Sequence, residues 1–275
     1  MTPPRPEGSE AAEPGLAVPG DAPGANAQPT DAGQTRSGNL VPEPRVTAMF
    51  DAIAPVYDRM NTLMTAGLDG SWRRKAVKAA GISAGGSALD VACGTGKLTL
   101  DLADIAGPPG NVVGLDLAPA MLVEAQKVAG DRPGVRFVLG NALALPFSNE
   151  TFDAATIGFG MRNLQNYRGG FAEMTRVVRP GGRVVCLELS TPRPRWFGRV
   201  YLGIFRFFAP ALGRLFGRRD AYAYLPQSLE GFPDPHEIAA TMRRAGLVNV
   251  GFKRLALGTV ALHVGTVPPR DGPQT

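Results

Sequence analysis

Two glycines and two acidic residues near the ends of apolar runs are the residues of this chain best suited to bind a ligand. Gly94 and Gly96 lie in the loop Cys93–Gly96, directly after one such run. Glycines at this place let the backbone approach a ligand closely and take positive φ angles. Asp90 precedes the loop, and Asp116 ends the next run twenty residues beyond Gly96, where a carboxylate can accept hydrogen bonds from both hydroxyls of a ribose. This spacing predicts a nucleotide-type cofactor.

The details of the loop favour S-adenosylmethionine over a dinucleotide. The dinucleotide fingerprint Gly-x-Gly-x-x-Gly needs a third glycine, and Thr99 stands at that place. Asp90 is suited to organise the loop near the amino-acid end of S-adenosylmethionine. A nicotinamide or flavin site, and with it an oxidoreductase, is the alternative from a different class. A structural strand–turn–helix with incidental acids is the alternative without a ligand.

Polar residues also follow the next two apolar runs. Asn141 and Ala142 come after the third run, and the asparagine side chain with its neighbouring backbone amides could read the edge of an adenine ring. The fourth run ends at Gly158 and leads to Arg162 and Asn163. Because the carboxyl ends of parallel strands face one crevice, Arg162 and Asn163 are predicted to meet the substrate there. A surface salt bridge is the alternative for Arg162.

Alternating strand and helix patterns must position these residues. Five strands are expected at Ala88–Ala92, Val112–Asp116, Val135–Gly140, Ala154–Gly158 and Arg183–Glu188, the last after a tight turn at Pro180–Gly182. Helices are expected at Lys97–Ile105, Pro119–Val128, Gly169–Val178 and Asp234–Ala245, and a terminal antiparallel hairpin at Val248–Leu255 and Ala261–Thr266. Apolar residues at helical spacing from Met49 to Met64, interrupted by Pro55, and a helix at Gly70–Ala80 precede them. The pattern predicts an α/β fold: the seven-stranded, Rossmann-like sheet of class I S-adenosylmethionine-dependent methyltransferases, with helices on both faces.

Length and composition limit the number and the extent of the domains that we expect. The 275 residues are 44% hydrophobic, enough for one substantial core. Residues 1–43 are rich in Pro, Gly and Ala and lack aromatic residues, so we expect a disordered tail there, one domain over 44–268 and a second disordered tail over 269–275. The sequence carries no signal peptide pattern and no apolar run of about 18 residues, and both cysteines lie in apolar runs. We therefore expect a reduced, cytoplasmic protein.

The segment 196–219, within an insertion over about 195–220, combines an apolar stripe at helical spacing with several arginines. The chain as a whole has a net charge of +5 and a pI of about 9.5. One interpretation is an interfacial helix on anionic lipid at the inner face of the cell membrane. The other is a lid helix that packs on the core. Nucleic acid is not an expected partner, because the segment is amphipathic. No metal is expected, because no His, Asp and Glu residues have ligand spacing.

Two specific stretches flank the glycine loop: Tyr57–Asn61, followed by Thr65–Leu68 and Trp72-Arg73, and Arg176–Gly182, running on to Ser190. With weaker agreement at Phe159–Asn163, Ala223–Pro226 and Ala261–His263, they make the chain from about Val46 to Gly265 resemble the UbiE/COQ5/MenG family of quinone C-methyltransferases. The resemblance implies cofactor contacts at Thr95, Asp116, Asn141 and Ala142. A further implied contact falls on Gly158, where some members have serine, and would have to come from the backbone.

The resemblance also implies a reaction, the C-methylation of a polyprenylated demethylmenaquinol to menaquinol, the last step of menaquinone biosynthesis. The family motifs do not separate this ring from that of a ubiquinone precursor or another small aromatic. Two residues depart from the family pattern: Arg179 stands where lysine is usual, and Asp69 where many members have histidine. A histidine base at position 69 is therefore not assumed. A noncatalytic, membrane-associated protein with the same fold is a further alternative.

The expected chemistry makes two demands on the site. A hydroquinone carbon becomes strongly nucleophilic when a ring hydroxyl loses its proton, so the site needs a proton acceptor and a group that stabilises the oxyanion. Arg162 is predicted to stabilise the oxyanion, and Asn163 to position a water or the hydroxyl. Tyr57, Asp58 and His263 are the candidate bases, and a water-assisted route is favoured over each of them.

Overall fold

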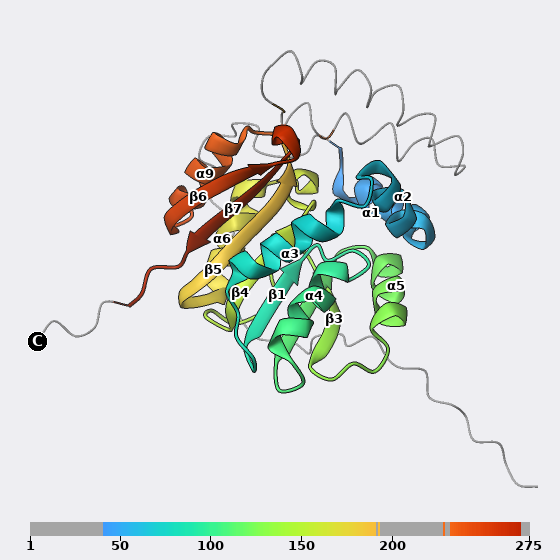
Figure 1. The fold of residues 1–275 in the computed structure, drawn as a ribbon, viewed down its shortest axis with the longest axis horizontal. Coiled ribbons are helices and arrows are strands. Elements are labelled where there is room, and N and C mark those ends of the chain that lie inside the picture. Colours follow the sequence, from blue (N-terminus) through green and yellow to red (C-terminus); the bar gives the residue numbers. More distant parts are fainter. Residues whose placement is uncertain (1–40, 191, 193–227, 229–231, 271–275) are drawn as a thin grey trace, which may run out of the picture.

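The structure is a computed structural model that describes residues 41–190, 192, 228 and 232–270 (Figure 1). Several expectations fall outside these residues: most of the N-terminal tail, the insertion over about 195–220 with its segment 196–219, the stretch 223–226 and residues 271–275. The domain boundaries at 43/44 and 268/269 stay predictions.

A seven-stranded sheet with the order β3-β2-β1-β4-β5-β7-β6 forms the centre of the molecule. Strands β1 to β5 pair in parallel, and β7 pairs antiparallel with both β5 and β6. All five residues of β1 are buried, as expected for a central strand covered on both faces. The strands are β1 (Ser87–Val91), β2 (Asn111–Asp116), β3 (Val135–Leu139), β4 (Phe152–Gly158), β5 (Val178–Leu189), β6 (Val248–Leu255) and β7 (Val260–Thr266). The predicted fold class, its parallel strands and its terminal hairpin are confirmed.

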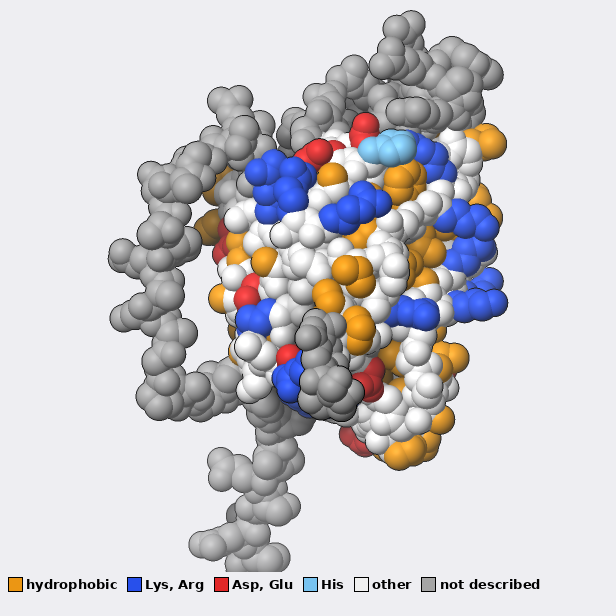
Figure 2. All heavy atoms as spheres, turned by 90° about the vertical axis from the view of Figure 1, so that its left-hand side faces the viewer, with side chains coloured by type: hydrophobic (Ala, Val, Ile, Leu, Met, Phe, Trp, Pro, Cys, Tyr) orange, Lys and Arg blue, Asp and Glu red, His pale blue; other side chains and the backbone are white. Residues whose placement is uncertain are grey.

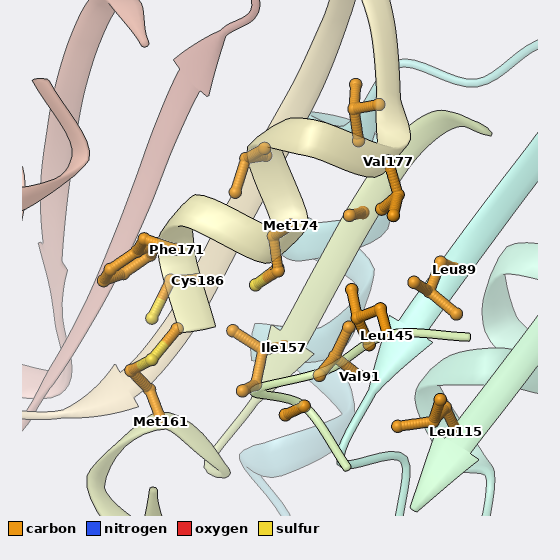
Figure 3. Close-up of a cluster of buried hydrophobic side chains, with 14 of the residues drawn as sticks. Leu89, Val91, Leu115, Leu145, Ile157, Met161, Phe171, Met174, Val177 and Cys186 are labelled. Atoms are coloured by element: carbon orange, nitrogen blue, oxygen red, sulfur yellow. The ribbon is translucent and has the colours of Figure 1, made fainter. Parts of the chain in front are cut away.

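Helices cover both faces of this sheet, with α3 and α4 in front and α6 behind in Figure 1. One core cluster joins buried residues of α3 and α4 to the sheet, and a second joins those of α6 and α9 to it. Figure 3 shows the second cluster, where Met174 and Val177 of α6 lie over Leu89 and Ile157. The helices are α3 (Asp69–Ala80), α4 (Lys97–Ala106), α5 (Pro119–Ala129), α6 (Tyr167–Val177) and α9 (Pro235–Arg244).

Three short N-terminal elements lie beyond one end of the sheet, next to α5 (Figure 1). They are α1 (Glu43–Ile53), the 3-10 turn η1 (Ala54–Val56) and α2 (Tyr57–Met64), so the helix predicted from Met49 to Met64 is broken at Pro55 as expected. A third core cluster holds them, in which Ile53 and Met60 pack with Met121 of α5. These elements are therefore part of the packed domain.

Basic side chains gather at the outer edge of the sheet. Figure 2 faces this side of the molecule and shows Lys and Arg side chains around α9 and β6. Exposed members are Arg243 and Arg244 at the end of α9 and Lys253 on β6. This edge lies across the sheet from β2 and β3, so its charge is not part of the cavities described below.

The helix predicted at Gly169–Val178 is confirmed as α6 with slightly different ends, whereas the turn predicted at Pro180–Gly182 was wrong. Helix α6 begins at Tyr167, because the Asn166 side chain caps it by accepting a hydrogen bond from the Gly169 amide at 3.0 Å, and it ends before Val178, the first residue of β5. The predicted tight turn at Pro180–Gly182 is a bulge inside β5. Phe152 of β4 pairs with Val178, whereas Ala154 pairs with Arg183. The bulge is stable because Gly181 takes a φ of +81° and donates to the Val267 carbonyl at 2.9 Å.

Candidate active site

The predicted ligand-binding residues converge at the carboxyl ends of the parallel strands, where two cavities share a wall. The first, here called the β2–β3 cavity, has a volume of about 750 Å³ and is bounded by α1 and the ends of β2 and β3. The second, the α2–α3 cavity, has a volume of about 1030 Å³ and is bounded by α2, α3 and the start of β7. The shared wall consists of Tyr57, Ala92, Gly94, Gly158 and Phe159.

The shared wall holds unusual backbone conformations. Ala92 has a φ of +52° and Phe159 a φ of +58°, in a region that residues other than glycine seldom adopt. Such a conformation costs about 1–3 kcal/mol at each residue, and it persists where the surrounding structure enforces it, often at ligand sites. Here the Phe159 amide is held by a 2.7 Å hydrogen bond to the Leu187 carbonyl. The wall, here called the partition, therefore has a backbone that is held in place at Phe159.

Asp116 lies in the β2–β3 cavity and fixes the glycine loop. Its Oδ2 accepts a hydrogen bond from the Gly94 amide at 2.8 Å, and its Oδ1 accepts one from the Ala118 amide at 2.9 Å. Burial raises the pKa of this carboxyl above its usual value. Each carboxylate oxygen has a second lone pair, so the predicted bonds to two ribose hydroxyls are compatible with these contacts.

Asn141 and Ala142 also line the β2–β3 cavity, but the asparagine side chain is engaged within the protein. Its Oδ1 accepts from the Leu143 amide at 2.8 Å, and its Nδ2 donates to Oε2 of Glu43 at 3.1 Å. Glu43 lines the same cavity from α1. Sequence reasoning missed Glu43, because it lies almost a hundred residues before Asn141 in a segment predicted as a tail.

Asp90 and Gly96 support the loop from behind and line neither cavity. Asp90 is buried, and its two oxygens accept hydrogen bonds from the hydroxyls of Thr99 and Thr156, both at 2.8 Å. Burial raises the pKa of Asp90 to about 7. Gly96 has a φ of +78°, and a Cβ there would lie 2.9 Å from the Phe137 ring. Thr99, which stands where the dinucleotide fingerprint has its third glycine, is therefore hydrogen-bonded to Asp90.

Thr95, Asp58 and Tyr57 lie together on the α2–α3 cavity. The Thr95 hydroxyl donates to Oδ1 of Asp58 at 2.7 Å, and Lys97 Nζ lies 3.4 Å from the same oxygen. Oδ1 of Asp58 is therefore already engaged. Burial raises the pKa of Tyr57 above its usual value, so its phenol stays protonated near neutral pH and can donate a hydrogen bond.

Arg162 lines the α2–α3 cavity and forms a buried ion pair with Glu188 at the end of β5. Their side chains are 6% and 2% exposed. Arg162 Nη1 lies 2.7 Å from Glu188 Oε1, and the Arg162 amide donates to Oε2 at 3.1 Å. Arg162 is thus both in the cavity and in a salt bridge, although the salt bridge is not at the surface. The signal that could have found Glu188 is a carboxylate inside an apolar strand, which requires a charged partner.

Asn163 lies on the other side of the partition from Arg162. It lines the β2–β3 cavity, and its Nδ2 lies 3.4 Å from the Phe159 carbonyl oxygen, which also accepts from Arg162 Nη1. The two residues were predicted to act on one substrate group. The turn η2 (Met161–Asn163) instead directs adjacent side chains to different cavities, as successive positions of a helical turn do.

His263, one of the candidate bases, lies away from both cavities. Its ring is buried in β7 with Nε2 3.0 Å from the Pro235 carbonyl oxygen, and burial lowers its pKa to about 4. His263 is therefore part of the packed interior and does not line either cavity. In the part of the chain that the structure describes, no three His, Cys, Asp or Glu residues are grouped to hold a metal ion. Nor does any helix in that part have both the length and the apolar character needed to cross a membrane.

Comparisons with known proteins extend this picture. The sequence profile of the ubiE/COQ5 methyltransferase family matches residues 39–267. A demethylmenaquinone methyltransferase of Anoxybacillus flavithermus is 41% identical over 229 residues, which are 82% of this chain and 97% of the relative. Another of the same name from Staphylococcus aureus is 37% identical, over 82% of this chain and 95% of the relative.

Solved structures share the fold at low sequence identity. A SAM-dependent methyltransferase of Thermotoga maritima matches with a TM-score of 0.56 and 18% identity, over 80% of this chain and 99% of that one. The [4+2]-cyclase SpnF matches with a TM-score of 0.60 and 17% identity, over 85% of this chain and all of that one. Since these two proteins are named for different activities, the shared fold does not by itself identify a reaction.

Proposed function

The chain belongs to the ubiE/COQ5 methyltransferase family, and from this membership we propose that it methylates a ring carbon of demethylmenaquinol with S-adenosylmethionine, giving menaquinol. One observation carries the proposal: relatives named demethylmenaquinone methyltransferase are 37–42% identical over 81–82% of this chain and 95–97% of their own length. Membership in a methyltransferase family also argues against the alternative of a nicotinamide-dependent oxidoreductase.

The β2–β3 cavity and the glycine loop fit S-adenosylmethionine. Asp116 offers acceptors at the end of β2, next to the Gly94 backbone that a ligand can approach without a side chain in between. Asn141 and Ala142 bound the same cavity at the end of β3, where an adenine ring would lie. When bound, S-adenosylmethionine supplies an electrophilic methyl group. Gly94 and Gly158 line both cavities, so the partition is where that methyl group would meet the substrate.

The α2–α3 cavity suits a flat aromatic ring with a hydroxyl group. The rings of Trp72 and Phe159 lie with their centroids 6.2 Å apart on its wall and offer apolar faces. Arg162 supplies positive charge, held in place by Glu188, and the protonated Tyr57 phenol can donate to the same ring oxygen. Arginine keeps its proton at any physiological pH, so Arg162 stabilises the oxyanion and is not the base.

Alignment and charge stabilisation then account for catalysis. The residues that line both cavities hold the two reactants next to each other, and such orientation can contribute about 7–11 kcal/mol. The ring-hydroxyl proton passes to water in the α2–α3 cavity, where Asp58 is a neighbouring acceptor, because His263 lies elsewhere. The oxyanion that remains is stabilised by Arg162 until the ring carbon has taken the methyl group. Loss of the hydrogen from that carbon and return of a proton to the ring oxygen then give menaquinol, with S-adenosylhomocysteine as the other product.

Thermal unfolding with S-adenosylhomocysteine and with NAD⁺ tests the cofactor. We expect S-adenosylhomocysteine at about 100 times its Kd to stabilise the protein by about 2.7 kcal/mol, because it binds only the folded state. NAD⁺ at the same concentration should leave the melting temperature unchanged. Stabilisation by NAD⁺ alone would contradict the proposed function.

Contact with the inner face of the cell membrane is a further part of the proposal. It is supported by the substrate, whose polyprenyl chain partitions into lipid, and by the apolar and arginine-rich composition of segment 196–219. Co-sedimentation with anionic liposomes, with and without residues 196–219, tests it. We expect the intact chain to bind more strongly, and equal binding by both chains would contradict this contact.

A further inference from the structure

Helix α1 brings a carboxylate to the cavity in which, under the proposed function, the adenosine part of the cofactor lies. Glu43, in the first turn of α1, is half-buried and lines the β2–β3 cavity with Val46 and Phe50 of the same helix. Its Oε2 accepts the hydrogen bond from Asn141 Nδ2 at 3.1 Å. Its Oε1 has no hydrogen-bond partner among the residues that the structure describes, so an acceptor atom is available at this wall.

The position of this carboxylate is held by contacts along α1. Val46 and Ile53 are buried, and Oδ1 of Asp51 accepts a hydrogen bond from the Ala120 amide in the first turn of α5 at 2.9 Å. At the other end, the Gln165 side-chain amide donates to the Val41 carbonyl just before the helix. Glu43 thus faces the cavity from a helix that is fixed before and after it.

The order of the strands orients the adenosine along this cavity. Asp116 ends β2, and Asn141 follows β3, which lies on the side of β2 away from β1. With the ribose at Asp116, the purine base therefore extends toward Asn141 and Glu43. The Oδ1 atom of Asn141 already accepts from the Leu143 amide, and its Nδ2 donates to Glu43. Glu43 consequently offers a carboxylate oxygen without a hydrogen bond to another described residue at the purine end.

Purines differ at this end in a way that a carboxylate can recognise. The 6-amino group of adenine has two N–H donors, whereas a 6-oxo purine presents an acceptor oxygen at the same place. An ionised carboxylate can only accept hydrogen bonds, so it can bind the 6-amino group but is repelled by the oxygen of a 6-oxo purine. A partly buried acceptor left facing another acceptor loses its hydrogen bond without replacement by water.

We propose that Glu43 reads the adenine base of the cofactor: its carboxylate accepts a hydrogen bond from the 6-amino group, and the site thereby selects a 6-amino over a 6-oxo purine. This inference rests on the proposed function, because it assumes an adenosine cofactor in the β2–β3 cavity. Helix α1 would then determine cofactor specificity as well as form one side of the β2–β3 cavity.

Calorimetric titration of the full chain with S-adenosylhomocysteine and with its 6-oxo analogue, S-inosylhomocysteine, tests the proposal. We expect the unmodified protein to prefer the adenosine form by at least about tenfold, the effect of one hydrogen bond to a charged group. Glu43→Gln should keep its affinity for the adenosine form within about threefold. It should lose most of the preference, because its amide can present either an acceptor or a donor. Glu43→Ala should bind the adenosine form about tenfold more weakly.

Glu124→Gln is the matched control, since Glu124 lies on α5, pairs with Lys127 at 2.8 Å and does not line the cavity. It should keep the preference of the unmodified protein. Because the preference is a ratio within each variant, a small loss of stability does not disturb it. An unchanged ratio in Glu43→Gln would overturn the role of Glu43 alone. An unmodified protein that binds neither ligand would overturn the proposed function and, with it, this inference.

Discussion

Arg162→Ala is expected to lower kcat by about 10²–10³-fold while the affinity for S-adenosylhomocysteine stays close to that of the unmodified protein. The expected loss is that of one preorganised group that stabilises charge in the transition state. Arg162 lines the α2–α3 cavity and not the β2–β3 cavity, so the proposed cofactor contacts at Asp116 and Asn141 are untouched. Steady-state kinetics and calorimetric titration separate the two effects. Near-normal kcat with cofactor bound would contradict the role of Arg162.

Two further variants control for damage to the fold. Arg168→Ala removes an exposed arginine on α6, close to Arg162 in sequence and outside both cavities, and should leave kcat unchanged. The double variant Arg162→Met/Glu188→Leu replaces the buried ion pair by apolar side chains, a change that is often neutral or stabilising. It should fold normally and remain as slow as Arg162→Ala. Recovery of activity in the double variant would show that Arg162 acts only by keeping Glu188 paired.

Glu188→Ala is expected to lower the free energy of unfolding by about 3–5 kcal/mol, the largest effect on stability that we foresee. Removing one partner of a buried pair leaves the other charge without compensation in a low-dielectric interior. Glu188 also accepts hydrogen bonds from the backbone amides of Arg162 and Leu189, at 3.1 and 2.8 Å, and these donors lose their acceptor as well. Urea unfolding measures the change.

The control for Glu188 is an ion pair of the same kind at the surface. Glu237→Ala breaks the pair with Arg244 on α9, whose side chains are 43% and 55% exposed, and should cost no more than about 1 kcal/mol. The double variant Arg162→Met/Glu188→Leu should recover most of the stability lost in Glu188→Ala. If Glu188→Ala were as stable as Glu237→Ala, the ion pair would not hold this part of the site together.

The strand ends could be predicted from the sequence because local patterns determine them. A buried parallel strand appears as an apolar run, and the residues after it lie at the edge where ligands bind. Asp116, Asn141 and Gly158 therefore line the β2–β3 cavity, whereas Thr95, also predicted as a cofactor contact, lines the α2–α3 cavity; their roles as cofactor contacts stay predictions. The bulge in β5 could not be predicted, because Pro180–Gly182 is equally suited to a turn. Only the pairing of Gly181 and Gly182 with Val267, far along the chain, keeps it in the sheet.

The remaining features of the site depend on contacts between distant residues. Glu188 meets Arg162 across 26 residues, and Glu43 meets Asn141 across 98. Sequence spacing also does not give the direction of a side chain within a short turn, so it could not tell that Arg162 and Asn163 face different cavities. Asp90 illustrates the same limit: its place before the loop suggested a ligand contact, but its carboxylate points to Thr99 and Thr156.

Methyl transfer to a reduced naphthoquinone ring can be tested directly by one measurement. The full chain is incubated with S-adenosylmethionine and reduced demethylmenaquinone, and the quinone is analysed by mass spectrometry, with a benzoquinol precursor and a reaction lacking enzyme in parallel. We predict a naphthoquinone product heavier by one methyl group, formed at a rate that falls about 10²–10³-fold in Arg162→Ala. An unchanged naphthoquinone mass, with the methyl group found on the benzoquinol or on neither ring, would contradict the proposed function.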